Sequence, residues 1–116
     1  MFQAQYLPAG SAVYSPWFAR GGDYLRATVE VVSLNGSAGI TVTVLTKKRD
    51  EYGDGAAVTG SIAKTSVGRS TTTEFGGTTS ATGLNDLVRY KFDPGSTSGE
   101  WVVFRMLAPS WFDAVK

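Results

Sequence analysis

The carboxylates are the first residues to test for chemistry, because two carboxyl groups can hydrolyse a glycosidic bond without help from other side chains. The sequence contains neither histidine nor cysteine. This excludes the commonest general base, thiolate zinc sites and every Ser-His-Asp or Cys-His arrangement. Four carboxylates are candidates, each on the polar face of a strand or beside a turn, and no spacing pairs them: Glu30, Glu74, Asp86 and Glu100. We therefore expect a protein that is not an enzyme, with no catalytic residue and no cofactor.

Metal and phosphate sites find equally little support. The stretch "DEYGDG" offers Asp50, Glu51 and Asp54 as oxygen ligands for calcium, but it lacks the spacing and the closing glutamate of an EF-hand. No glycine pair precedes a helix, so a phosphate-binding loop is not expected. "ARGGDYL" differs from an RGD tripeptide by one glycine, and we interpret it as a turn in which Gly21 and Gly22 supply unusual backbone angles.

Length and charge limit the class of protein. The 116 residues suit a single domain, residues 1–116, and eleven basic against ten acidic side chains leave a net charge of +1. So weak a field favours neither nucleic acid nor an anionic membrane as partner. The opening "MFQAQYLPAG" lacks the basic and apolar regions of a secretion signal, and no apolar run is long enough to span a membrane. We expect synthesis in a cytoplasm.

Alternating apolar and polar residues predict strands along most of the chain. Residues 24–33 and 40–46 alternate most clearly, and the Asn35-Gly36 pair between them predicts a hairpin. Two weaker strands are expected at about 57–65 and 69–75, and a helical turn at 84–87 precedes a strand at 88–92. Residues 3–7 and 12–19 form two more strands or an extended arm, with Pro16 confining the second piece to an edge or a bulge.

The predicted fold is all-β. About seven or eight strands with turn signals between them indicate an antiparallel β-sandwich or small barrel, jelly-roll-like in type. A short N-terminal arm, about residues 1–10, and an aromatic C-terminal tail, about residues 109–116, flank it.

The last segment, "WVVFRMLAPSWFDAVK", is the most informative. Its strand carries apolar groups on both faces, with Val102, Phe104 and Met106 on one side and Trp101 and Val103 on the other. Such a strand is either covered twice by its own domain or covers a neighbouring chain. Pro109 cannot continue the ladder, so the aromatic pair that follows, Trp111 and Phe112, forms either a knob that binds a partner or a plug over the core.

We predict a partner interface from these residues, since buried tryptophan is a favoured interface hot spot. Arg105 is expected either to stack on Trp101 or to pair with an acid across the sheet. A charged loop forms a second predicted contact surface for an acidic partner. The complete predicted set is Trp101, Arg105, Leu107, Trp111 and Phe112, followed by Lys47, Lys48 and Arg49.

Several stretches together carry a family resemblance: the central "ATVEVVSLNGSAGITVTVLTKKRDEYGDG", the late "LVRYKF" and the closing "FRMLAPSWF". They resemble the small virion structural proteins of tailed phages and phage-derived particles, in particular head decoration or auxiliary proteins. The resemblance implies a non-enzymatic protein of the virion that binds other virion proteins, of the capsid or the tail, either as a symmetric homo-oligomer or at a symmetry axis of the particle. It carries over no catalytic residue.

A carbohydrate-binding β-sandwich module is the alternative. Three tryptophans and five tyrosines are enough aromatic rings for stacking on sugars, which makes a glycan a possible partner. This alternative requires two or more coplanar, exposed rings on one face.

Overall fold

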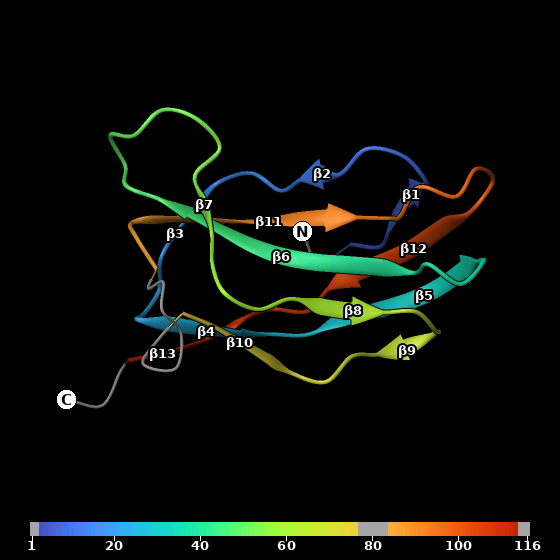
Figure 1. Ribbon diagram of the computed structural model, residues 1–116. Helices are drawn as coiled ribbons and strands as arrows, with labels where there is room; N and C mark the ends of the chain where they lie inside the picture. Colours follow the sequence, from blue (N-terminus) through green and yellow to red (C-terminus); the bar gives the residue numbers. More distant parts are fainter. Residues whose placement is uncertain (1–2, 77–83, 114–116) are drawn as a thin grey trace.

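A computed structural model of the chain describes residues 3–76 and 84–113. All regular structure in these residues is β, with thirteen antiparallel strands in three sheets and no helix. The strands stack in a sandwich-like arrangement (Figure 1). The predicted all-β antiparallel fold is confirmed, with more strands than the seven or eight expected.

The first sheet, called the β12 sheet, has the strand order β1-β12-β5-β9. Its members are β1 (Gln5–Pro8), β12 (Trp101–Met106), β5 (Val29–Asn35) and β9 (Gly68–Arg69). The register of β12 with β5 shifts between Val103 and Phe104, which leaves Val32 as the extra residue of a bulge. Because of this bulge, Val31 and Leu34 both contact the core although they are three residues apart, and Val32 is exposed.

The second sheet, called the β11 sheet, has the order β2-β11-β6-β7, with β3 also paired to β11 and β8 to β6. Its strands are β2 (Val13–Tyr14), β11 (Leu87–Asp93), β6 (Ile40–Lys47), β7 (Ala56–Ala57), β3 (Phe18–Ala19) and β8 (Ile62–Lys64). The third sheet, called the β13 sheet, orders β10 (Thr73–Gly76), β4 (Tyr24–Ala27) and β13 (Ser110–Phe112).

The core lies where the inward faces of the sheets meet. Phe92 of β11 and Phe104 of β12 touch across it, with ring centroids 4.9 Å apart. Full burial of side chains of this size stabilises a fold by about 1.5–3 kcal/mol each. The predicted inward residues of the last strand are buried, as are those of residues 24–33 and 40–46: Leu25, Ala27, Val29, Val31, Ile40, Val42, Val44, Val102, Phe104 and Met106.

The predicted hairpin of residues 24–33 with 40–46 is wrong. The first segment is divided at Thr28 into β4 and β5, and β5 pairs with β12 and β9, whereas β6 pairs with β11, β7 and β8. The connection crosses from one sheet to the other instead, with Gly36 and Gly39 at φ of 97° and 61°. Both strands bury an apolar face, and placing them in facing sheets covers one face with the other.

The weaker predictions are partly met. The segments 57–65 and 69–75 contain short strands, β7 to β10, and residues 12–19 hold β2 and β3 on either side of Pro16. The predicted helical turn at 84–87 does not form, because the backbone N–H of Asn85 donates to Thr46 Oγ1 and β11 begins at Leu87. Within the predicted N-terminal arm, residues 5–8 form a strand of the β12 sheet.

Candidate functional site

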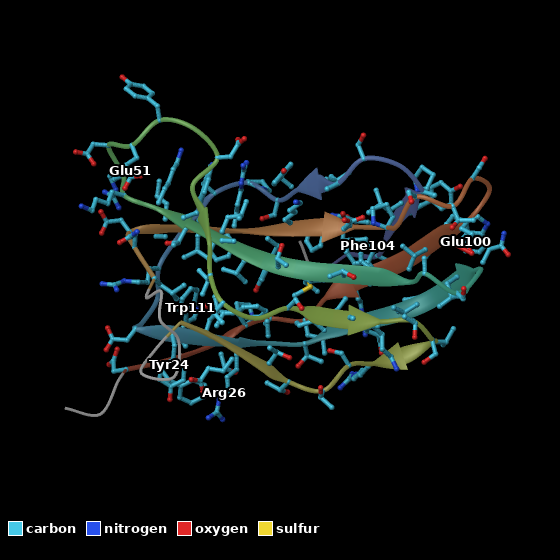
Figure 2. All side chains as sticks on the ribbon, in the orientation of Figure 1. Tyr24, Arg26, Glu51, Glu100, Phe104 and Trp111 are labelled. Atoms are coloured by element: carbon cyan, nitrogen blue, oxygen red, sulfur yellow. The ribbon has the colours of Figure 1, made fainter. Side chains whose placement is uncertain are left out.

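The predicted interface residues do not form one surface. Trp101, Arg105 and Leu107 belong to β12 or its end, Trp111 and Phe112 to β13, and Lys47 to Arg49 follow from the end of β6. Figure 2 shows Trp111 and Glu100 at opposite ends of the molecule, and Trp101 directly follows Glu100. The molecule measures 45 Å along its longest axis, so these groups lie on separate surfaces.

Trp111 plugs the core of its own chain. Pro109 does end the ladder of β12, but the chain resumes as β13 and pairs antiparallel with β4, opposite Leu25 at Trp111. The indole packs against the core and meets Phe18 edge-on at 6.3 Å. Two roles were predicted for the aromatic tail, and Trp111 has that of the plug. We call Trp111 and Phe18 together the Trp111 plug.

The Gly21-Gly22 pair makes room for this strand. A Cβ on Gly21 would lie 2.8 Å from the Trp111 ring, and one on Gly22 would lie 2.7 Å from the carbonyl oxygen of Phe112. Neither glycine has a positive φ. The predicted unusual backbone angles are therefore wrong: these positions are glycine because β13 approaches them closely.

Phe112 is 38% exposed but already has partners within the β13 sheet. Its ring stacks on Tyr24 at 5.4 Å with an interplanar angle of 17°, and the Arg26 guanidinium lies 4.9 Å from its centroid. Arg26 also pairs with Glu74 at 3.7 Å. Figure 2 shows Tyr24 and Arg26 near Trp111 at this end of the molecule.

The outer side of β12 carries apolar side chains that face solvent. Trp101 and Val103 are half-buried there, Tyr6 of β1 is 63% exposed, and Val32 at the bulge is 49% exposed. The rings of Tyr6 and Trp101 are 5.9 Å apart and tilted by 42°. We call these four residues the Trp101 face. Sequence analysis identified Trp101 but missed Tyr6, which the register of β1 brings to this side, and Val32, which the bulge exposes opposite Val103 and Phe104.

An ion-pair network borders the Trp101 face. Glu30 Oε1 accepts from Arg105 Nε at 2.6 Å, and Glu30 Oε2 accepts from Arg69 Nε at 3.4 Å. The hydrogen bond from Arg105 is the main cause that holds the pKa of Glu30 below its usual value, and Arg69 acts in the same direction. Of the two predicted roles for Arg105, pairing across the sheet is the one observed. Leu107 is half-buried just beyond β12, and its N–H donates to the carbonyl of Thr28.

The charged loop after β6 is fastened at its base. Lys47 Nζ lies 4.5 Å from the centroid of Trp17 and donates to the carbonyl of Gly53. Lys48 and Arg49 are exposed, and their backbone N–H groups donate to Glu51 Oε1 and Asp86 Oδ2. We call residues 48–55 the Tyr52 loop, after the side chain at its tip, which is 100% exposed.

A pocket of about 200 Å³ opens between β1 and β2, at one edge of the sandwich. Phe92 and Phe104, both almost fully buried, take part in its lining. Gln5 stands opposite Phe104 in the register of β1 with β12 and faces the same side. We call it the aromatic pocket, and its lining residues are Gln3, Gln5, Tyr14, Ser15, Pro16, Trp17, Phe18, Phe92 and Phe104.

The four carboxylates considered for catalysis each have a separate partner. Glu30 binds Arg105, Glu74 pairs with Arg26, Asp86 accepts from the Arg49 N–H, and Glu100 accepts from the Ser37 N–H. Within residues 3–76 and 84–113, no three acidic side chains gather as metal ligands would. In the calcium candidate, Asp54 pairs instead with Arg89 at 3.0 Å.

Comparison of the chain with protein-family models, curated proteins and solved structures finds no match. No helix long and apolar enough to cross a membrane occurs in the described part of the chain.

Proposed function

We propose that this protein is a non-enzymatic structural subunit of a larger particle, of the virion kind that its sequence resembles, and that the Trp101 face joins it to a neighbouring copy. The observation that carries the proposal is the solvent-facing apolar side of β12. Tyr6, Val32, Trp101 and Val103 gather on one face of one sheet, and aromatic residues of this kind are enriched at the centres of interfaces.

The surroundings of this face agree with an interface. Its centre is free of charge, while Arg105, Glu30 and Arg69 lie to one side, already paired with each other. An uncharged centre with a polar rim is the usual anatomy of a protein–protein contact. At the rim of a contact these paired charges keep their contact with water, so they add little desolvation cost to association.

The three tryptophans give little support to the carbohydrate alternative. Lys47 and Arg89 each lie 4.5 Å from the ring centroid of Trp17, and Trp111 packs against the core. Trp101 is tilted by 42° from Tyr6 and so does not form a flat platform with it. A stacking surface for sugar rings needs faces that are coplanar and free.

The test is the mass of the protein in solution at rising concentration, measured by light scattering. We expect the parent chain to exceed the monomer mass of 12.3 kDa and Val103→Lys to lower the assembled mass, because a lysine at the centre of the face must be desolvated on contact. Thr41→Lys is the matched control, since Thr41 is a half-buried β6 position on the outside of the opposite sheet, and should keep the parent mass.

A parent chain that stays monomeric at all concentrations contradicts the proposal. So does a Val103→Lys variant that assembles like the Thr41→Lys control. The virion assignment has its own check, because genes for capsid, portal or tail proteins are expected beside the gene for this chain.

A further inference from the structure

We propose that the aromatic pocket binds a small, neutral aromatic molecule, a single ring of the size of phenol with a substituent that forms hydrogen bonds. This inference goes beyond the proposed function, because a structural subunit needs no ligand. The pocket is lined by inward residues of two sheets, whereas the Trp101 face lies on the outside of β12. Either site can therefore fail its test without the other.

The pocket is an opening into the core at the edge of the sandwich where β1 and β2 lie. Phe92 of β11 and Phe104 of β12 take part in its lining, and their ring centroids are 4.9 Å apart. Figure 1 shows β1 and β2 along the same edge, and Figure 2 shows Phe104 within the sandwich. A ring that enters here meets other aromatic rings, which it can contact edge-on or in an offset stack.

Pro16 accounts for one wall of this opening. β2 and β3 both pair with β11, but the residues between them belong to no strand. Pro16 has no N–H to donate to a ladder. At this point Ser15 Oγ, and not a backbone carbonyl, accepts from the N–H of Tyr90, at 2.9 Å. The chain leaves the ladder here, and residues 15–17 line the pocket.

The neighbouring aromatic residues of this wall are held in place by the protein itself. Trp17 has cation–π contacts with Lys47 and Arg89, each 4.5 Å from its ring centroid. Phe18 meets the rings of Tyr90 at 5.5 Å and Trp111 at 6.3 Å. Because these side chains are already ordered, a ligand costs little conformational entropy when it binds, which favours affinity.

The volume of the pocket limits the ligand to about one ring. A cavity of roughly 150 Å³ lined by apolar side chains is known to bind benzene. The pocket has a volume of about 200 Å³. It therefore accommodates a six-membered ring with a small substituent.

The lining indicates a neutral ligand. Among the described residues that line the pocket, none is acidic or basic. A charged ligand would lose its hydration there and gain no ion partner, which is costly. The exposed amides of Gln3 and Gln5 instead supply donors and acceptors for a neutral polar substituent. Gln5 stands opposite Phe104 in the register of β1 with β12, so its amide lies on the pocket side of the sheet.

A sugar fits this lining less well than an aromatic ring. Sugar hydroxyls surround the whole ring and need polar partners on every side. Inside the pocket, however, Ser15 Oγ already accepts from the N–H of Tyr90 and donates to the carbonyl of Pro16. Two glutamines on one side and aromatic rings inside suit a molecule that is polar at one end only.

Nuclear magnetic resonance of the parent protein in dilute solution, with phenol as the probe, tests the inference. Trp17 lines the pocket and Trp101 does not, so their indole N–H signals distinguish binding in the pocket from general effects. We expect the Trp17 signal to shift and saturate, with a dissociation constant of about 1 mM for a ligand of this size. The Trp101 signal should not move. Benzoate, which is charged, and methyl glucoside should each bind at least about tenfold more weakly than phenol.

Variants of the lining extend the test. Gln5→Phe fills the pocket from its own wall and should weaken phenol binding at least about tenfold. Gln3→Ala combined with Gln5→Ala leaves the pocket open but removes both amides, so phenol should lose its preference over toluene. Val67→Ala is the control, because it changes an exposed side chain that does not line the pocket, and it should bind phenol like the parent. The double variant and the parent titration remain decisive if Gln5→Phe fails to fold.

Several results would overturn the inference: a Trp17 signal that does not respond to phenol, an equal shift at Trp101, or a Gln5→Phe variant that binds like the parent. Binding of benzoate or methyl glucoside as tight as that of phenol would contradict the neutral aromatic class. A Trp17 signal that moves with protein concentration but not with phenol would show that a second copy covers the pocket, which also overturns it. The mass of the protein in solution, which tests the Trp101 face, is a separate measurement.

Discussion

Trp101 and Trp111 are ten residues apart in one segment, yet they lie at opposite ends of the molecule and in different surroundings. Trp111 has a strand partner in β4, a ring partner in Phe18 and two glycines that make room for its strand. Trp101 is half-buried on the outside of β12, beside the exposed Tyr6, and Val32 is exposed at the bulge of β5. The first region is closed by its own chain, and the second leaves apolar area facing solvent.

This difference shows that an aromatic residue near a chain end is not in itself a sign of binding. The deciding feature is whether another part of the same chain covers the ring. For Trp111 the core and Phe18 cover the ring, and the glycine pair leaves the space that its strand needs. For Trp101 the neighbouring side chains enlarge the apolar face.

The largest expected effect on stability is that of Trp111→Ala. Removing the plug leaves a gap against Phe18 and should lower the free energy of unfolding by about 3 kcal/mol. Urea denaturation followed by circular dichroism measures it. Phe112→Ala is the matched control on the next residue of β13, and its cost should be clearly smaller because its ring lies outside the core. Equal costs for the two substitutions would contradict the distinction between them.

Gly21→Ala should cost about 2 kcal/mol, since the added Cβ would lie 2.8 Å from the Trp111 ring. The same substitution in a Trp111→Ala background should cost much less, because the ring that it meets is gone. A double-mutant cycle measures this coupling. If Gly21→Ala lowers the free energy of unfolding equally in both backgrounds, the glycine is required by the backbone and not by contact with the Trp111 ring.

Tyr90, which contacts Phe18 of the Trp111 plug, should make the stability of the fold depend on pH. It is fully buried against Phe18, its hydroxyl has no hydrogen-bond partner in the described structure, and burial raises its pKa to about 12. The unfolded chain therefore releases this proton near pH 10 while the folded chain retains it. Ionisation of Tyr90 therefore leaves the free energy of unfolding unchanged below pH 10 and lowers it by about 2 kcal/mol as the pH rises to 12.

Tyr90→Phe should remove that alkaline loss and leave the fold at least as stable near neutral pH, because no hydrogen bond is sacrificed. Urea midpoints at pH 8, 10 and 11.5 compare the two proteins. Parallel declines for parent and variant above pH 10 would show that Tyr90 is not the group responsible.

The smallest expected effect belongs to the border of the Trp101 face. The pKa of Glu30 is lowered by Arg105, so the carboxylate stabilises the fold above its unfolded pKa, and this contribution disappears as the pH falls through the folded pKa. Glu30→Gln should therefore be slightly less stable than the parent at pH 7 and equal to it in strong acid. Thermal unfolding from pH 7 to pH 2 tests this, and a difference that persists in acid would point to packing.

Local alternation in the sequence predicted the inward faces well. Val102, Phe104 and Met106 were assigned to one side of a strand and are all buried. Alternation depends only on neighbouring residues, so sequence analysis captures it. The predicted hairpin was wrong because strand pairing depends on which distant strand covers each apolar face. In the structure β5 and β6 are in facing sheets.

The roles of the two tryptophans depended on contacts of the same long-range kind. Nothing near Trp111 reveals that Gly21 will lie beneath its ring, and nothing near Trp101 reveals Tyr6 as its neighbour. The aromatic pocket requires the register of β1 with β12, which places Gln5 opposite Phe104. The sequence does contain the glycine pair and Gln5, but only the structure shows which residues lie beside them.

Hydroxyl-radical footprinting of the parent protein, in dilute and in concentrated solution, tests the central claim most directly. It reports the oxidation of each aromatic side chain without any substitution. We predict that oxidation of Tyr6 and Trp101 falls as the protein assembles, while that of Trp111 and Phe112 is unchanged. Protection of Phe112 and Trp111 with no change at Tyr6 and Trp101 would contradict it.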